Sequence, residues 1–97
     1  MTVEEFQNKL IDSKGLVVIL FVAPWCKYCP PVIQDFRANC KGITLAIFNV
    51  ALPESRAVKE ECDVQRYPTV IAFRGTLEVK RMEGHKLTAI QFIGECS

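Results

Sequence analysis

The sequence predicts an α/β domain in which a mixed sheet of about four strands is flanked by about four helices. Short apolar runs rich in β-branched residues alternate with segments whose apolar residues recur every three or four positions. The last two strand-like runs are separated only by the tight connection Arg74-Gly75-Thr76, which indicates an antiparallel hairpin. We therefore expect the order helix, strand, helix, strand, helix, strand, strand, helix.

The first helix is expected near residues 3–12, because Thr2 and Glu5 have the spacing of a capping box. Residues 16–22 are apolar and β-branched throughout, which is typical of a central strand that is covered on both faces. A second helix is expected next, because one set of apolar residues follows helical spacing: Cys29, Val32, Ile33, Phe36 and Cys40.

Residues 43–50 form the second apolar run, and Pro53 opens a short helix. Residues 69–73 and 77–82 are the two strands of the hairpin, and the second of them has the polar composition of an edge strand. The apolar face of a last helix consists of Ala89, Phe92, Ile93 and Cys96. Strands that are separated by helices are expected to pair in parallel, and the hairpin then makes the sheet mixed.

Length and charge restrict the function further. A chain of 97 residues has room for one hydrophobic core, so we expect a single domain over residues 1–97. Its net charge of +1 argues against binding to nucleic acid or to an anionic membrane. The longest uncharged apolar run, residues 16–25, is shorter than the ~20 residues of a membrane-spanning helix. Acidic residues precede this run, unlike the basic start of a signal peptide, so we expect a cytoplasmic location.

The five cysteines include one closely spaced pair: Cys26, Cys29, Cys40, Cys62 and Cys96. An odd number argues against a secreted disulfide framework. A structural zinc site usually needs a second cysteine pair or matched histidines, so we expect no metal. A Cys-x-x-Cys pair alone still leaves half a metal site, or coincidence, as alternatives to redox chemistry. The other three cysteines are expected to act as small hydrophobic residues on helix faces.

The candidate site is the segment Trp25-Cys26-Lys27-Tyr28-Cys29, which lies between a buried strand and a helix. Cys26 falls at or just before the start of the helix, where unpaired amides and the helix dipole favour a thiolate. Lys27 adds a positive charge beside it, whereas Cys29 lies one turn further along, on the apolar face. We therefore expect Cys26 to attack a substrate disulfide and Cys29 to resolve the mixed disulfide.

The chain resembles the thioredoxin family over nearly its whole length. The resemblance lies in strand 17–22, in Ala23-Pro24 before the cysteine segment, in Tyr67-Pro68-Thr69 before a strand, and in Gly84. It implies a thioredoxin fold and a cis Tyr67–Pro68 bond. The sequence starts almost at its first helix, so we expect the usual N-terminal strand of the family to be absent or vestigial. It also implies reduction or exchange of protein disulfides without a bound cofactor, and a thioredoxin-reductase-like electron donor.

The same resemblance assigns the surroundings of the catalytic cysteines. An apolar rim suits an extended peptide better than a small charged substrate, and we expect a monomer whose substrate contacts are Trp25, Lys27, Tyr28, Tyr67 and Pro68. One alternative is an adaptor that uses the same rim to hold a partner without turnover. A glutathione-dependent activity like that of glutaredoxins is a lesser alternative, because residues 83–86 lack the Gly-Gly and Asp that bind glutathione.

Two positions depart from the family pattern. Thioredoxins usually carry a buried Asp six residues before the first cysteine, often faced by a Lys, and here these positions are Leu20 and Ile47. We therefore expect Cys29 to be deprotonated through water or a substrate group, and resolution to be slow. The dipeptide Lys27-Tyr28 stands where Gly-Pro is usual, and it leaves the reduction potential open.

Overall fold

The computed structural model describes residues 1–84 and 86–96, so His85 in the loop after the last strand lies outside the described residues. The expected order of elements is confirmed. The helices are α1 (Val3–Asp12), α2 (Cys29–Asn39), α3 (Arg56–Glu61) and α4 (Ala89–Glu95), and a 3₁₀ turn (Pro53–Ser55) precedes α3. The strands are β1 (Leu16–Val22), β2 (Thr44–Asn49), β3 (Thr69–Arg74) and β4 (Leu77–Glu83).

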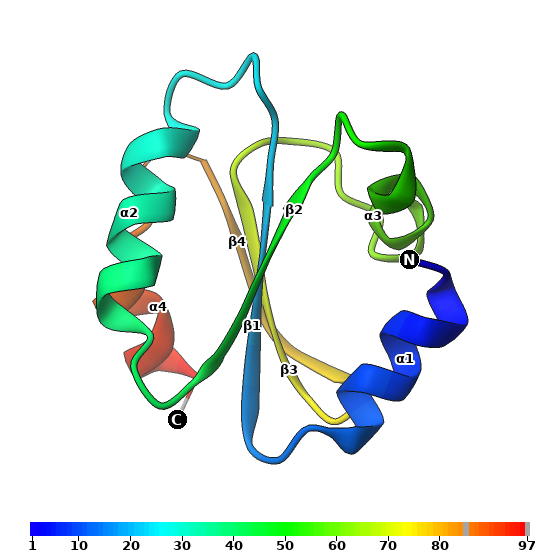
Figure 1. Ribbon diagram of the computed structural model, residues 1–97. Coiled ribbons are helices and arrows are strands. Elements are labelled where there is room, and N and C mark those ends of the chain that lie inside the picture. Colours follow the sequence, from blue (N-terminus) through cyan, green and yellow to red (C-terminus); the bar gives the residue numbers. More distant parts are fainter. Residues whose placement is uncertain (85, 97) are drawn as a thin grey trace.

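The four strands form one mixed sheet in the order β2-β1-β3-β4. β1 pairs in parallel with β2, and β3 pairs with β4 in the expected antiparallel hairpin. The expectation of parallel pairing wherever a helix separates two strands was wrong for β3, which runs antiparallel to β1. The reason is that residues 50–68 leave and rejoin the sheet at the same end, so β3 runs back beside β1 (Figure 1).

Helices cover both faces of the sheet, with α2 and α4 on one face and α1 and α3 on the other (Figure 1). Alternate residues of β1 enter different cores. Val18, Leu20 and Val22 pack on the side of α2 and α4, whereas Val17, Ile19 and Phe21 belong to the second core. This alternation explains why residues 16–22 are apolar without interruption: both sides of the strand are covered.

Helix α2 is fixed to α4 by polar and apolar contacts. The Asp35 carboxylate accepts a hydrogen bond from the backbone N–H of Ala89 at 2.8 Å, at the first turn of α4. The rings of Phe36 and Phe92 pack beside it with centroids 6.1 Å apart. The helix that begins at Cys29 is therefore held along its length and cannot shift freely against the sheet.

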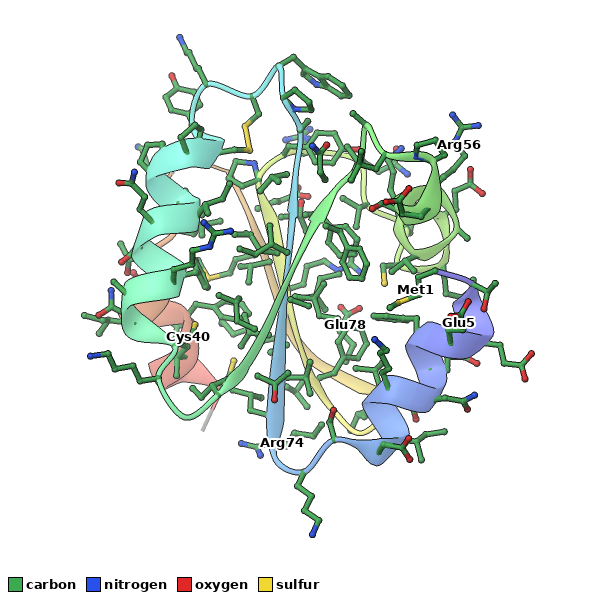
Figure 2. All side chains as sticks on the ribbon, viewed as in Figure 1. Met1, Glu5, Cys40, Arg56, Arg74 and Glu78 are labelled. Atoms are coloured by element: carbon green, nitrogen blue, oxygen red, sulfur yellow. A yellow bond between two sulfur atoms is a disulfide. The ribbon has the colours of Figure 1, made fainter. Side chains whose placement is uncertain are left out.

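The two ends of the sheet differ in what they carry. The Cys26–Cys29 disulfide lies at the start of α2, and Figure 2 shows its sulfur–sulfur bond at one end of the molecule. Arg74, at the opposite end, is the last residue of β3, and its guanidinium donates to the backbone oxygen of Cys96 at 3.4 Å. None of the helices in the described ranges has the length and apolar character that crossing a membrane requires.

Candidate active site

The cysteine segment forms the bend between the buried strand β1 and helix α2. The N–H of Cys26 donates to the carbonyl of Ala23 at 3.1 Å, and the N–H of Cys29 donates to the carbonyl of Cys26 at 3.2 Å. Helix α2 begins at Cys29, and Pro30 and Pro31 occupy its first turn, where a missing N–H removes no helical hydrogen bond. Cys26 thus lies in the turn immediately before the helix.

Cys26 and Cys29 form a disulfide, with their Cα atoms 5.5 Å apart. The two residues differ in access to solvent: Cys29 is only 2% exposed and belongs to the core under α2, whereas Cys26 is half-buried. An incoming disulfide can therefore approach the sulfur of Cys26 while the sulfur of Cys29 stays covered.

On the β3 side of the disulfide lies an aromatic rim. Trp25 is 70% exposed, which is inconsistent with a plain core aromatic, and its ring meets the Tyr67 ring edge-on with centroids 6.1 Å apart. The Tyr67–Pro68 bond is cis, as the resemblance implies. The carbonyl of Pro68 accepts from the N–H of Gly84 at 3.0 Å, which connects the loop before β3 to the end of β4.

Lys27 and Tyr28 project from the tip of the same bend, and both are exposed. The Lys27 ammonium lies 5.1 Å from the centroid of the Tyr28 ring, a cation–π geometry. The structure therefore brings Trp25 together with Tyr67, and Lys27 together with Tyr28, at one end of the sheet.

On the β2 side of the disulfide lies a small cavity of about 210 Å³. Both cysteines line it, together with Pro30 and Ile33 of α2 and Asn49 at the end of β2. The sequence argument missed Asn49. A signal was present, because Asn49 is the one amide in the apolar run 43–50, two positions after Ile47 and therefore on the same face of the strand.

The two positions that depart from the family pattern meet in the core under α2. Leu20 is fully buried and stands opposite Ile47 in the β1–β2 register. Both residues pack in the same cluster as Cys29, and the buried members of that cluster are apolar residues and cysteines. The nearest carboxylate along α2 belongs to Asp35, more than one turn from Cys29, and it accepts from Ala89 and Asn39.

The remaining cysteines lie away from the disulfide. Cys40 and Cys62 are buried free thiols, and Cys96 is a half-buried one. Burial raises the pKa of the Cys62 thiol to about 11, and it also raises the thiol pKa of Cys40 and Cys96. Within residues 1–84 and 86–96, no three His, Cys, Asp or Glu side chains gather closely enough to hold a metal ion.

The thioredoxin family model matches residues 1–93. The chain is 33% identical over 87 residues to an H-type thioredoxin of Brassica oleracea, an alignment that covers 86% of this chain and 71% of that protein. The chain belongs to the thioredoxin family. It is also 32% identical over 89 residues to a probable protein disulfide-isomerase A6 of Medicago sativa, covering 87% of this chain and 24% of that protein.

Among solved structures, thioredoxin f2 of Chlamydomonas reinhardtii superposes with a TM-score of 0.80 at 18% identity, covering 98% of this chain and 89% of that one. This likeness confirms the thioredoxin fold. Together with the Cys26–Cys29 pair, the family membership identifies this thioredoxin-family chain as a protein dithiol–disulfide oxidoreductase.

Proposed function

We propose that Cys26 is the attacking thiol and Cys29 the resolving thiol of a cycle that reduces or exchanges protein disulfides. The observation that carries this assignment is the difference in exposure, because only the half-buried Cys26 offers its sulfur to a protein substrate. Its position just before α2 adds support, since the free amides and dipole at a helix start favour a thiolate.

In the reducing direction, the Cys26 thiolate attacks one sulfur of a substrate disulfide, and the other substrate sulfur leaves as a thiolate that takes up a proton. The Cys29 thiol then loses its proton and attacks the sulfur of Cys26. This step breaks the mixed disulfide and releases the second substrate thiol. Two electrons have then passed to the substrate, and the enzyme holds the Cys26–Cys29 disulfide.

The proposed substrate is an extended peptide segment around an exposed disulfide, and its contacts are Trp25, Lys27, Tyr28, Tyr67 and Pro68. Of these, only Pro68 has a fully buried side chain. Large exposed aromatic side chains supply contact area at low cost in side-chain entropy, which suits transient binding of many sequences. The exposed Trp25 ring against Tyr67 supports this role, because it leaves an apolar surface directly beside the disulfide.

We assign the return of electrons to a thioredoxin-reductase-like flavoprotein, and the site of action to the cytoplasm. Three free thiols in one small chain suit a reducing compartment, which supports the second assignment. We further propose that residues 1–97 act as one monomeric domain without a bound cofactor, because the reaction needs only the two cysteines and a thiol donor.

Reduction of insulin disulfides by dithiothreitol tests the proposal, with the wild-type chain compared with Cys26→Ser. The wild type should speed the precipitation of the insulin chains, and Cys26→Ser should be no faster than dithiothreitol alone. A matched control is Cys40→Ser, which removes a buried thiol remote from the disulfide and should stay active. Full activity of Cys26→Ser would reject the assigned role of Cys26.

A further inference from the structure

The resolving step poses a chemical problem in this chain. The Cys29 thiol must lose a proton before its sulfur can attack, because the thiolate is the nucleophile. Yet Cys29 is 2% exposed, and the positions where a buried acid and lysine would stand hold Leu20 and Ile47. Among the described residues, the buried polar side chains are those of Ser55 and Thr69, so no buried carboxylate, lysine or histidine accepts the proton.

The cavity on the β2 side offers a path to solvent. Its volume of about 210 Å³ exceeds the roughly 30 Å³ that a water molecule occupies in the liquid, so several waters fit. Cys26 and Cys29 both line it, and its remaining walls are largely apolar. A water needs polar partners to stay in such a place, and the polar side chain at this wall is that of Asn49.

The orientation of the Asn49 amide is fixed by its neighbours. Its Oδ1 accepts a hydrogen bond from the N–H of Ala51 at 3.0 Å, so Nδ2 points away from that bond. Leu45 and Ile47 face the core under α2, so Asn49, two positions further along β2, faces the same side. Among the described residues, every buried side-chain nitrogen or oxygen has a hydrogen-bond partner. Nδ2 of Asn49 donates no hydrogen bond to these residues, so Nδ2 is not buried and is open to solvent.

We propose that Asn49 is a positioning residue for the resolving step: its Nδ2 group donates a hydrogen bond to a water of the cavity, and this water links Cys29 to bulk solvent. The proton of Cys29 passes along the water chain, through the open side of the cavity, to a base in solution such as hydroxide or buffer. The Cys29 thiolate then attacks the sulfur of Cys26, and the substrate sulfur leaves with the electron pair of the broken bond. This inference rests on the proposed roles of Cys26 and Cys29.

The sheet topology makes this route compatible with bound substrate. β1 lies between β2 and β3, so the bend that follows β1 has a different neighbour on each side. The aromatic rim with Tyr67 lies on the β3 side, whereas the cavity with Asn49 lies on the β2 side. A peptide held against Trp25 and Tyr67 therefore leaves the cavity open to water.

Stopped-flow reaction of the reduced protein with 5,5′-dithiobis(2-nitrobenzoate) separates the two steps. Attack by Cys26 releases the first coloured thiolate, and attack by Cys29 on the mixed disulfide releases the second. The leaving thiolate needs no proton, so the second phase reports the deprotonation and attack of Cys29. The protein is kept in excess, and Cys29→Ser shows which phase belongs to Cys29.

Asn49→Leu should slow the second phase about tenfold, less than the hundredfold or more of a dedicated general base, and should leave the first phase unchanged. Asn49→Asp keeps the acceptor for Ala51 but puts a carboxylate at the cavity. It should speed the second phase and give its rate an inflection at the pH where the new carboxylate titrates. Asn8→Leu is the matched control, because it makes the same exchange on the exposed side of α1.

Equal slowing of both phases in Asn49→Leu would show a merely structural effect and overturn the proposal. A second phase in Asn49→Asp with the wild-type rate and pH profile would also overturn it, even if Asn49→Leu does not fold. The assigned cysteine roles fail differently: in that case Cys29→Ser would retain both phases, whatever the Asn49 variants do.

Discussion

The two flanks of the Cys26–Cys29 disulfide have opposite character. Toward β3, the surface is exposed and aromatic, with the Trp25 ring edge-on to Tyr67. Toward β2, the surface is recessed and holds a cavity whose polar side chain is that of Asn49. The difference indicates that substrate contact and proton removal use separate sides of one bend, so substitutions on the two flanks should affect different kinetic steps.

Removal of Cys29 gives the largest expected effect on turnover, because substrate contact on one flank and proton removal on the other both lead to its attack. In Cys29→Ser, turnover of a protein disulfide should fall at least about a thousandfold, whereas a single attack by Cys26 should persist. Mass spectrometry should then show one substrate bound covalently per chain. Retention of turnover in this variant would mean that a third thiol resolves the complex, and Cys96, the half-buried one, could be tested next.

Loss of the aromatic rim should affect binding alone. Trp25→Ala should raise KM for a protein disulfide about tenfold, which corresponds to the ~1.4 kcal/mol expected for an exposed aromatic contact. The second phase of the chromogenic reaction should keep its rate, because the β2 flank is untouched. Ile90→Ala is the control, since Ile90 is equally exposed, at 71%, but lies on α4. A slower second phase in Trp25→Ala would contradict the separation of the flanks.

A carboxylate at position 20, in the core that holds Cys29, should accept the Cys29 proton, so that its passage through the cavity water is no longer needed. Leu20→Asp should speed the second phase a few-fold and make its rate depend on titration of the new carboxyl group. The change should also lower the free energy of unfolding by at least about 2 kcal/mol, because a polar group enters a fully apolar core. Rate against pH and urea denaturation measure the two effects. An unchanged pH profile would count against the need for another proton acceptor.

The smallest expected effect on the two kinetic phases is that of removing a thiol remote from the disulfide, and this variant serves as the control. Cys62→Ala should change neither phase, because Cys62 packs in the core on the opposite face of the sheet. Its folded pKa of about 11 exceeds the ~8.5 of a free thiol, so its contribution to stability is present below about pH 8.5. That contribution is lost as the pH rises toward 11.

Urea denaturation between pH 8 and 11 measures this contribution. The free energy of unfolding should fall more steeply with pH in the wild type than in Cys62→Ala, and groups shared by both chains cancel in the difference. Parallel curves would show that Cys62 does not keep its proton longer in the folded state. A change in either kinetic phase would show that the two faces of the sheet are coupled.

Most of the fold followed from local pattern. The unbroken apolar run 16–22 is explained by burial on both faces, and the helical spacing after Cys29 by one side facing the sheet. The direction of β3 did not follow, because residues 50–68 contain a helix but return to the end of the sheet where they started. Helix content alone does not determine at which end a connection closes.

The site was predictable where neighbours in sequence are neighbours in space. Cys26 and Cys29 lie in one bend, and the resemblance placed Tyr67 beside them. Asn49 was missed because its relation to Cys29 depends on the parallel register of β1 and β2, which pairs Val22 with Asn49. An asparagine in a strand also gives little indication of function by itself. The proposed role of Asn49 arises because position 20 holds no carboxylate.

The placement of the chain's last helix has a practical consequence for handling the protein. Arg74, at the end of the sheet opposite to the disulfide, donates a hydrogen bond to the backbone oxygen of Cys96. A linker, bead or sensor surface attached behind α4 therefore sits on the rear of the molecule. Chains immobilised in this way present Cys26 to the solution. Substrates held on Cys26 as mixed disulfides can therefore be collected while the protein stays attached to the surface.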